Sequence, residues 1–191
     1  MSIGAVQHHY PARDQLLAAM LEYIVNDYDA AYQRLFSGLP SNGEARLIGA
    51  IDYLTRDLCN QETRSAFFSL WALSCHNKFA AALVDESYLH HRRNLAGFIG
   101  AARPGFSQDQ CFHAATAIAA MLEGLMIFTG SGMRHALDPT RLTAVVRAAV
   151  TRLLSDGFPA RLDHGSHDGP GAVTHRIRGA VARQGKRRGE S

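Results

Sequence analysis

The sequence has few of the features that build disulfide frameworks, zinc sites or membrane spans. Its three cysteines, Cys59, Cys75 and Cys111, are an odd number and form no CxxC pair. Such a set favours free thiols in a reducing compartment. The longest apolar run, residues 114–122, ends at Glu123, whereas a membrane helix needs about 20 apolar residues. No secretory signal precedes it, so we expect a soluble, cytoplasmic protein.

Signatures of catalysis and of metal binding are also missing. The sequence has no GxSxG elbow and no glycine-rich phosphate loop after a strand. Its ten histidines include the pairs His8-His9 and His90-His91, but neighbours on a helix point about 100° apart and cannot chelate one ion. Glu86 and His90 share a face, yet a di-iron bundle repeats Glu-x-x-His on two helices. We expect no metal, no cofactor and no enzymatic activity.

Positive charge is concentrated at the carboxyl end. The chain has a net charge of +3, and residues 157–191 hold seven Lys and Arg against three Asp and Glu, which leaves −1 for the rest. The same segment has seven glycines and few large apolar residues, a composition that does not build a core. We expect a disordered basic tail over 157–191 and no broad nucleic-acid surface on the preceding body.

Apolar residues recur at three- and four-residue spacing from residue 13 to residue 154, which is the spacing of one helix face. The first run predicts a helix from Arg13 to Phe36. Ser41 with Glu44 and Ser107 with Gln110 have capping-box spacing, and Asp138-Pro139 predicts a further helix start. No useful period-2 alternation is present, so an all-α fold is expected. The last helix is expected to bury Leu142, Val145, Val146, Ala149, Leu153 and Leu154.

The opening segment carries the most informative pattern. The sequence predicts a short helix over residues 2–10 that ends in Tyr10, a turn at Pro11 and a long helix from Arg13, although a mere lead-in to that long helix over residues 1–12 fits the same pattern. This order resembles the tetracycline-repressor-like (TetR) family of one-component transcriptional regulators. The resemblance implies that residues 1–12 are the recognition helix and turn of a helix-turn-helix. The implied contacts to operator DNA are Ser2, Ile3, Ala5, Gln7, His8, His9 and Arg13.

The resemblance also sets the domain organisation. It implies an all-α ligand-binding and dimerisation domain over residues 13–156. Met1 falls where the turn before the recognition helix ends, so the two helices that brace it are expected to be absent from this sequence. Two hypotheses follow: a ligand-responsive, DNA-binding regulator that acts as a repressor, or a helical dimerisation and ligand-binding protein that does not bind DNA.

Residues 114–125, followed by residues 138–142, resemble the last two helices of the same family. In that family these helices pack against their copies in a second subunit as a four-helix bundle. The small residues at 114, 117, 120 and 124 permit close approach of helices, although an intramolecular core helix has the same pattern. The expected homodimer interface comprises Ala114, Ala117, Ala120, Gly124, Val145, Ala149 and Leu153.

The aromatic-rich segment 67–76 resembles the helix that lines the effector cavity of that family. Apolar walls with a few polar groups suit a small, apolar effector, although an aromatic stripe at helical spacing is also typical of plain core. The candidate ligand-binding residues are Phe67, Phe68, Trp71, Cys75, His76, Phe98, Phe112, His113 and Met121.

Overall fold

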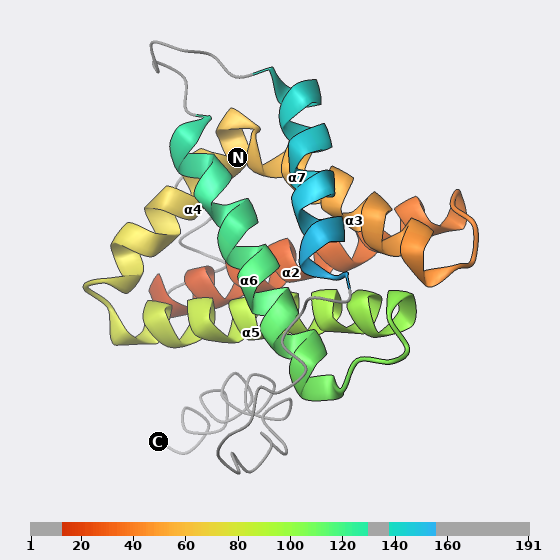
Figure 1. Ribbon diagram of the computed structural model, residues 1–191. Helices are drawn as coiled ribbons and strands as arrows, with labels where there is room; N and C mark the ends of the chain where they lie inside the picture. Colours follow the sequence, from red (N-terminus) through yellow and green to blue (C-terminus); the bar gives the residue numbers. More distant parts are fainter. Residues whose placement is uncertain (1–12, 130–137, 156–191) are drawn as a thin grey trace.

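The computed structural model describes residues 13–129 and 138–155, and over these ranges it holds helices and no strands (Figure 1). The all-α expectation is confirmed. The expectations for the recognition helix at 1–12 and for the tail at 157–191 lie outside the described residues. The helices are α2 (Arg13–Ser37), α3 (Gly43–Leu58), α4 (Gln61–Ser74), α5 (Lys78–Ala102), α6 (Gln108–Phe128) and α7 (Pro139–Leu153).

Short polar side chains fix where the helices begin. The capping box of Ser107 and Gln110 is present at the start of α6, and Asp138 caps α7 ahead of Pro139. The box expected from Ser41 is wrong, because Asn42 caps α3 instead and its side chain accepts from the Ala45 N–H at 2.7 Å. Asparagine caps as well as serine does, so the helix begins one residue later than the spacing predicts.

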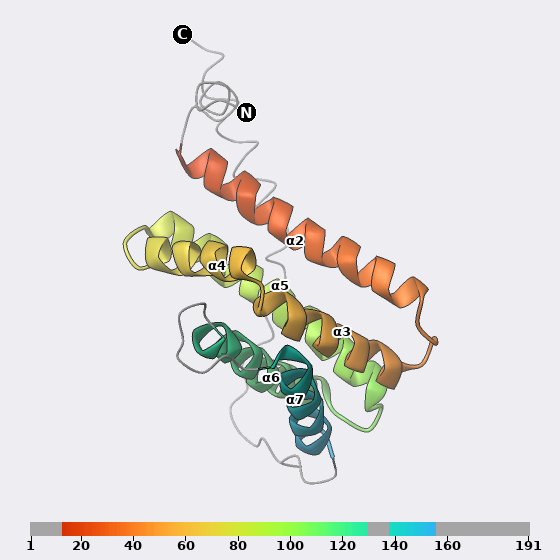
Figure 2. The same cartoon turned by 90° about the horizontal axis from the view of Figure 1, so that it is seen from above.

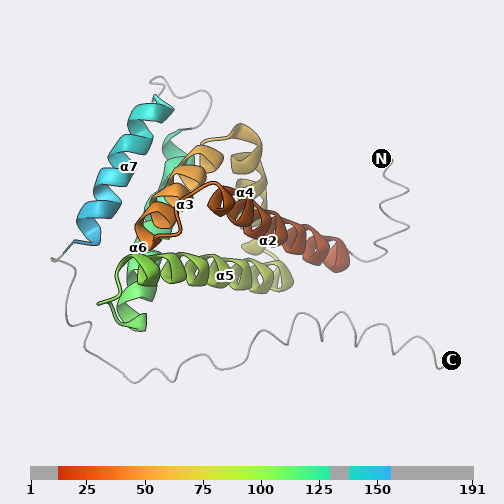
Figure 3. The same ribbon diagram turned by 90° about the vertical axis from the view of Figure 1, so that its right-hand side faces the viewer.

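The helices form three layers (Figure 2). The middle layer contains α3, α4 and α5, with α2 on one side and α6 and α7 on the other. Helix α5 packs against α2, α3, α4 and α6, while α7 packs against α3. Figure 3 shows that α2 begins on the side of the molecule opposite α7. The fully buried side chains that hold the layers together include Leu47, Ile51, Leu54, Leu58, Leu95, Ile99, Ile118, Leu122 and Met126.

Helix α6 is the most apolar of the described helices. Within the described ranges it is the one helix long and apolar enough, by length and composition, to cross a membrane. The mean hydropathy over a long stretch of the helix decides this property, so a search for consecutive apolar residues does not reveal it. Ile118, Leu122 and Met126 are nevertheless fully buried inside the protein, and a core helix also has this composition.

Helix α7 buries Val146 and Leu154 as expected, and Leu142 and Leu153 are partly buried against the core. Val146, Val150 and Leu154 are buried, at the four-residue spacing of one face. Val145 is 64% exposed and Ala149 is also exposed, so their expected burial is wrong. The reason is rotational, because a one-residue shift turns a side chain by about 100° around the helix.

Candidate functional site

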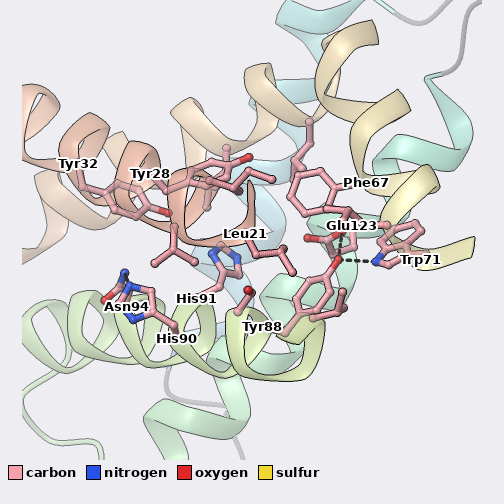
Figure 4. A pocket seen from close by; sticks show the side chains of 17 residues that line it. Leu21, Tyr28, Tyr32, Phe67, Trp71, Tyr88, His90, His91, Asn94 and Glu123 are labelled. Carbon is pink, nitrogen blue, oxygen red and sulfur yellow. Dashed lines mark hydrogen bonds between the residues drawn. The ribbon is translucent and has the colours of Figure 1, made fainter. Parts of the chain in front are cut away.

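A cavity lies between α2 and the helices α3, α4, α5 and α6 (Figure 4). Its volume is about 60 Å³, and apolar side chains form most of its surface. Five aromatic rings and five polar side chains are spaced along it. The lining residues are Leu21, Ile24, Val25, Tyr28, Tyr32, Leu54, Leu58, Phe67, Leu70, Trp71, Val84, Ser87, Tyr88, His90, His91, Asn94 and Glu123.

One end of the cavity contains a chain of hydrogen bonds from three helices. The Trp71 indole Nε1–H of α4 donates to the Tyr88 hydroxyl of α5 at 2.8 Å, and that hydroxyl donates to Glu123 Oε2 of α6 at 3.0 Å. Figure 4 shows these two bonds meeting at the Tyr88 oxygen. Each donor has an acceptor, so the carboxylate is held in one place against the aromatic rings.

Burial governs the charge of this carboxylate. It raises the pKa of Glu123 from 4.5 to about 7, while the hydrogen bond from Tyr88 acts in the opposite direction. Burial, followed by the nearby Glu123 charge, raises the pKa of Tyr88 above its ordinary value. Tyr88 therefore remains a donor, and Glu123 titrates near neutral pH.

Aromatic faces surround the same end. The Phe67 and Trp71 rings of α4 lie 6.4 Å apart between centroids and are tilted by 55°, and Tyr88 faces them from α5 (Figure 4). Aromatic faces attract cations, and a desolvated site strengthens the attraction. Rings beside a buried carboxylate form a site that can hold a small organic cation.

The other end of the cavity ties α2 to the middle layer. Asp29 of α2 accepts from Asn94 Nδ2 at 2.9 Å and lies 3.0 Å from His90 Nε2, both on α5. The Tyr28 hydroxyl of α2 donates to Asp57 Oδ2 of α3 at 2.5 Å. These contacts position the face of α2 that closes the cavity.

His91 lies between the two ends (Figure 4). Burial lowers the pKa of its imidazole from 6.5 to about 4, and the charges of His90 and Arg92 lower it further. The imidazole is neutral at pH 7 and adds no positive charge that would repel a cationic ligand.

The structure brings two of the expected ligand-binding residues to the cavity. Phe67 and Trp71 line it. The remaining expected residues do not line it. Phe68, Cys75, His76 and His113 are exposed, Phe98 and Met121 pack against the core, and the Phe112 ring lies 5.2 Å from the Arg92 guanidinium carbon.

Several lining residues were missed by the sequence argument. Tyr28 and Tyr32 lie on the periodic apolar face of α2. The same spacing is typical of a helix that packs on a plain core, so it does not mark a cavity. Glu123 carried the clearest signal, because it follows directly after the apolar run 114–122 in a helix that is otherwise mostly apolar. A carboxylate at such a position needs a partner or a function. His91 and Tyr88 had no distinguishing pattern.

The residues expected at a dimer interface divide into two groups. Ala117 and Ala120 are exposed on α6, and an added Cβ at Gly124 meets nothing within 4 Å. Val145 and Ala149 are exposed on α7, and Leu153 is half-buried. The assignment of Ala114 to the interface is wrong, because its side chain is fully buried within this chain. The outward face of α6 continues through Ile127 and Phe128, which are 54% and 62% exposed.

The expected DNA-contacting residues are not placed by the structure. Ser2, Ile3, Ala5, Gln7, His8 and His9 lie outside the described residues. Arg13 is the first residue of α2. The described residues include no group of three or more His, Cys, Asp or Glu side chains suited to a metal ion.

Comparison with known proteins gives a family and a fold. Residues 43–155, more than half of the chain, match the C-terminal family of BetI-type transcriptional repressors. No protein of curated function matches in sequence. A proposed transcriptional regulator from Pseudomonas aeruginosa PAO1 has a similar structure, with a TM-score of 0.66 and 20% identity over 82% of this chain and 76% of that one. A proposed regulator from Saccharomonospora viridis, in complex with choline, has a TM-score of 0.60 and 18% identity over 82% and 80% of the two chains.

Proposed function

This chain belongs to the TetR-like transcriptional regulators with a BetI-type repressor C-terminal domain, and we propose that it is a cytoplasmic, ligand-responsive regulator whose cavity binds a small organic cation. The observation that carries the proposal is the partly buried Glu123 carboxylate, which accepts from Tyr88 among the rings of the cavity. The sequence alone favoured an apolar effector, and the missed carboxylate changes that expectation.

The chemistry of the site favours a quaternary ammonium group. Such a cation has no hydrogen bonds to lose on burial, and aromatic cages recognise it through the ring faces. Glu123 supplies the countercharge, which a buried cation requires. The similar structure from Saccharomonospora viridis is a complex with choline, a ligand of this class.

The place of the cavity against α2 couples binding to movement. Helix α2 forms one wall and packs mainly on α5 and α3. A ligand that favours a shifted α2 changes the population of that state.

Helix α2 also leads to the segment proposed to read DNA. In this proposal residues 1–12 form the recognition helix and turn, and a homodimer places two such segments on half-sites about one duplex turn apart, or a multiple of it. A shift of α2 changes their separation and lowers operator affinity. The dimer forms through the outward faces of α6 and α7, where Ala117, Ala120 and Gly124 allow close approach.

The ligand class is tested by fluorescence, because Trp71 is the single tryptophan and lines the cavity. Titration at pH 8 compares choline with 3,3-dimethyl-1-butanol, its neutral carbon isostere. We expect choline to bind at least about tenfold more tightly, and Glu123→Gln to remove that preference. The matched control is Glu62→Gln, which removes an exposed carboxylate from α4. Equal binding of the two compounds contradicts the proposal.

DNA binding is tested separately, by selecting duplexes from a random library with the whole chain. Recovery of a two-fold symmetric site that choline releases supports the regulator. Binding of choline without any selected site favours the alternative, a helical dimerisation and ligand-binding protein that does not bind DNA.

A further inference from the structure

The Tyr32 hydroxyl is an unpaired polar group in a buried place. Tyr32 is 3% exposed, and its hydroxyl oxygen is the one buried side-chain nitrogen or oxygen in the described ranges without a hydrogen-bond partner. A buried hydroxyl without a partner has lost its hydration and gained nothing in return. Such a group therefore requires an explanation in terms of a ligand or an ordered water molecule.

Packing fixes the direction of this hydroxyl. The Tyr32 ring is stacked on Phe36 at 5.9 Å and meets Phe98 and Tyr53 edge-on at 5.2 Å and 6.0 Å. Three neighbouring rings prevent the side chain from turning toward another acceptor. Tyr32 also lines the cavity from α2 (Figure 4), so a ligand in the cavity lies beside this side chain.

The surroundings of Tyr32 select the kind of partner. Burial, followed by the nearby Tyr53, Asp29 and Asp57, raises the pKa of Tyr32 above its ordinary value, so the hydroxyl remains protonated. The hydroxyl is therefore a hydrogen-bond donor, and its missing partner is an acceptor. The two carboxylates disfavour an anionic acceptor in the same place, which leaves an uncharged oxygen, such as that of a hydroxyl, ether or carbonyl group.

This donor lies at the opposite end of the cavity from Glu123 (Figure 4). Tyr88 donates to Glu123 at one end, and Asn94 binds α2 beside Tyr32 at the other. These two residues of α5 are six positions apart. At 1.5 Å per residue the two ends are separated by about 9 Å along the helix. Apolar side chains, including Leu21 and Ile24, lie along the cavity.

We propose that Tyr32 is a specificity-determining residue, and that the effector is an elongated molecule with a cationic group at Glu123, an apolar middle and an uncharged acceptor oxygen at the Tyr32 hydroxyl. This inference rests on the proposed function, because it assumes that the cation occupies the Glu123 end. It adds a second polar contact, from α2, to the ligand contacts from α4, α5 and α6. A ligand of this form touches the helix whose position it controls.

The test compares two probes of equal length, (6-hydroxyhexyl)trimethylammonium and heptyltrimethylammonium, by titration of Trp71 fluorescence. The measured quantity is the ratio of their dissociation constants in the wild type, in Tyr32→Phe and in Tyr53→Phe. Tyr53 is the matched control, because it packs beside Tyr32 but does not line the cavity. We expect Tyr32→Phe to shift the ratio about tenfold against the hydroxyl probe and Tyr53→Phe to leave it unchanged.

Two results overturn the inference alone: a ratio unaffected by Tyr32→Phe, or equally tight binding of (6-carboxyhexyl)trimethylammonium and the hydroxyl probe. Failure of every cationic probe to bind overturns the proposed function together with it. Thermal unfolding of the ligand-free protein adds an independent measurement. Loss of an unpaired buried hydroxyl leaves stability unchanged or raises it, whereas a clear loss of stability in Tyr32→Phe shows that the hydroxyl already has a partner.

Discussion

Replacement of Glu123 by glutamine has an effect on stability that depends on pH in a defined way. The folded protein holds this carboxyl with a pKa of about 7, against 4.5 when unperturbed. A raised carboxyl pKa contributes fully to stability below about pH 4.5, where both states are protonated. That contribution is lost as the pH rises through about 7, because the unfolded chain ionises first.

The magnitude follows from the size of the shift. A shift from 4.5 to about 7 corresponds to about 3 kcal/mol, at about 1.4 kcal/mol per pKa unit. Glutamine has no such penalty. Glu123→Gln is therefore expected to stabilise the protein by up to about 3 kcal/mol at pH 8, and to change its stability little near pH 4.5. The hydrogen bond from Tyr88 can be retained, because the amide oxygen also accepts.

The assay is urea unfolding followed by far-ultraviolet circular dichroism between pH 4.5 and pH 8.5, at one protein concentration because the proposed dimer makes stability depend on concentration. Glu22→Gln is the control, since that carboxylate is exposed on α2, and its effect is expected to vary little with pH. A Glu123→Gln effect that is constant across the range, or that becomes more destabilising as the pH rises, refutes the reasoning.

Further predictions concern the middle of the cavity, the packing of α3 and the outer face of α6. His91 has a pKa of about 4 in the folded protein, against 6.5 when unperturbed. The contribution of its neutral imidazole to the free energy of unfolding is therefore lost as the pH falls from about 6.5 to 4. His91→Phe is expected to reduce that loss in the same unfolding series. Gly43→Ala places a Cβ 2.1 Å from the Ala101 carbonyl oxygen and is expected to lower the free energy of unfolding by about 1–3 kcal/mol. Gly97→Ala meets nothing within 4 Å and is expected to raise it by about 1 kcal/mol; equal effects of the two glycine variants contradict the packing. Ala120→Arg is expected to convert the dimer to monomer in sedimentation velocity without loss of helix content, and a dimer that persists contradicts the proposed interface.

The sequence predicts the helices well because their signals are local. The spacing of apolar residues predicted α2 to within a residue of its observed end, and Ser107 and Asp138 marked the starts of α6 and α7. The capping of α3 was misplaced by one residue because Ser41 and Asn42 are both good caps. The chemistry of neighbouring side chains decides where a helix begins, so the error at the start of α3 is a single residue.

The cavity could not be predicted to the same degree because its wall comes from five helices far apart in the sequence. Tyr88 and Glu123 are brought together by the packing of α5 on α6, and no pattern within either helix records that pairing. Val145 and Val146 show the same limit, because both fit an apolar face and only the orientation of α7 on α3 decides which is buried. A carboxylate in an apolar helix remains the usable signal for such a site.

The most direct test of the central claim, that a buried carboxylate in this cavity binds an organic cation, is calorimetry of choline binding at pH 7 in buffers of different ionisation enthalpy. The pKa of Glu123 is about 7, so the carboxyl is partly protonated there, and a bound cation favours its ionised form. The account predicts that choline binding releases protons, and that Glu123→Gln abolishes this release. Choline binding without proton release, or with the same release in Glu123→Gln, contradicts it.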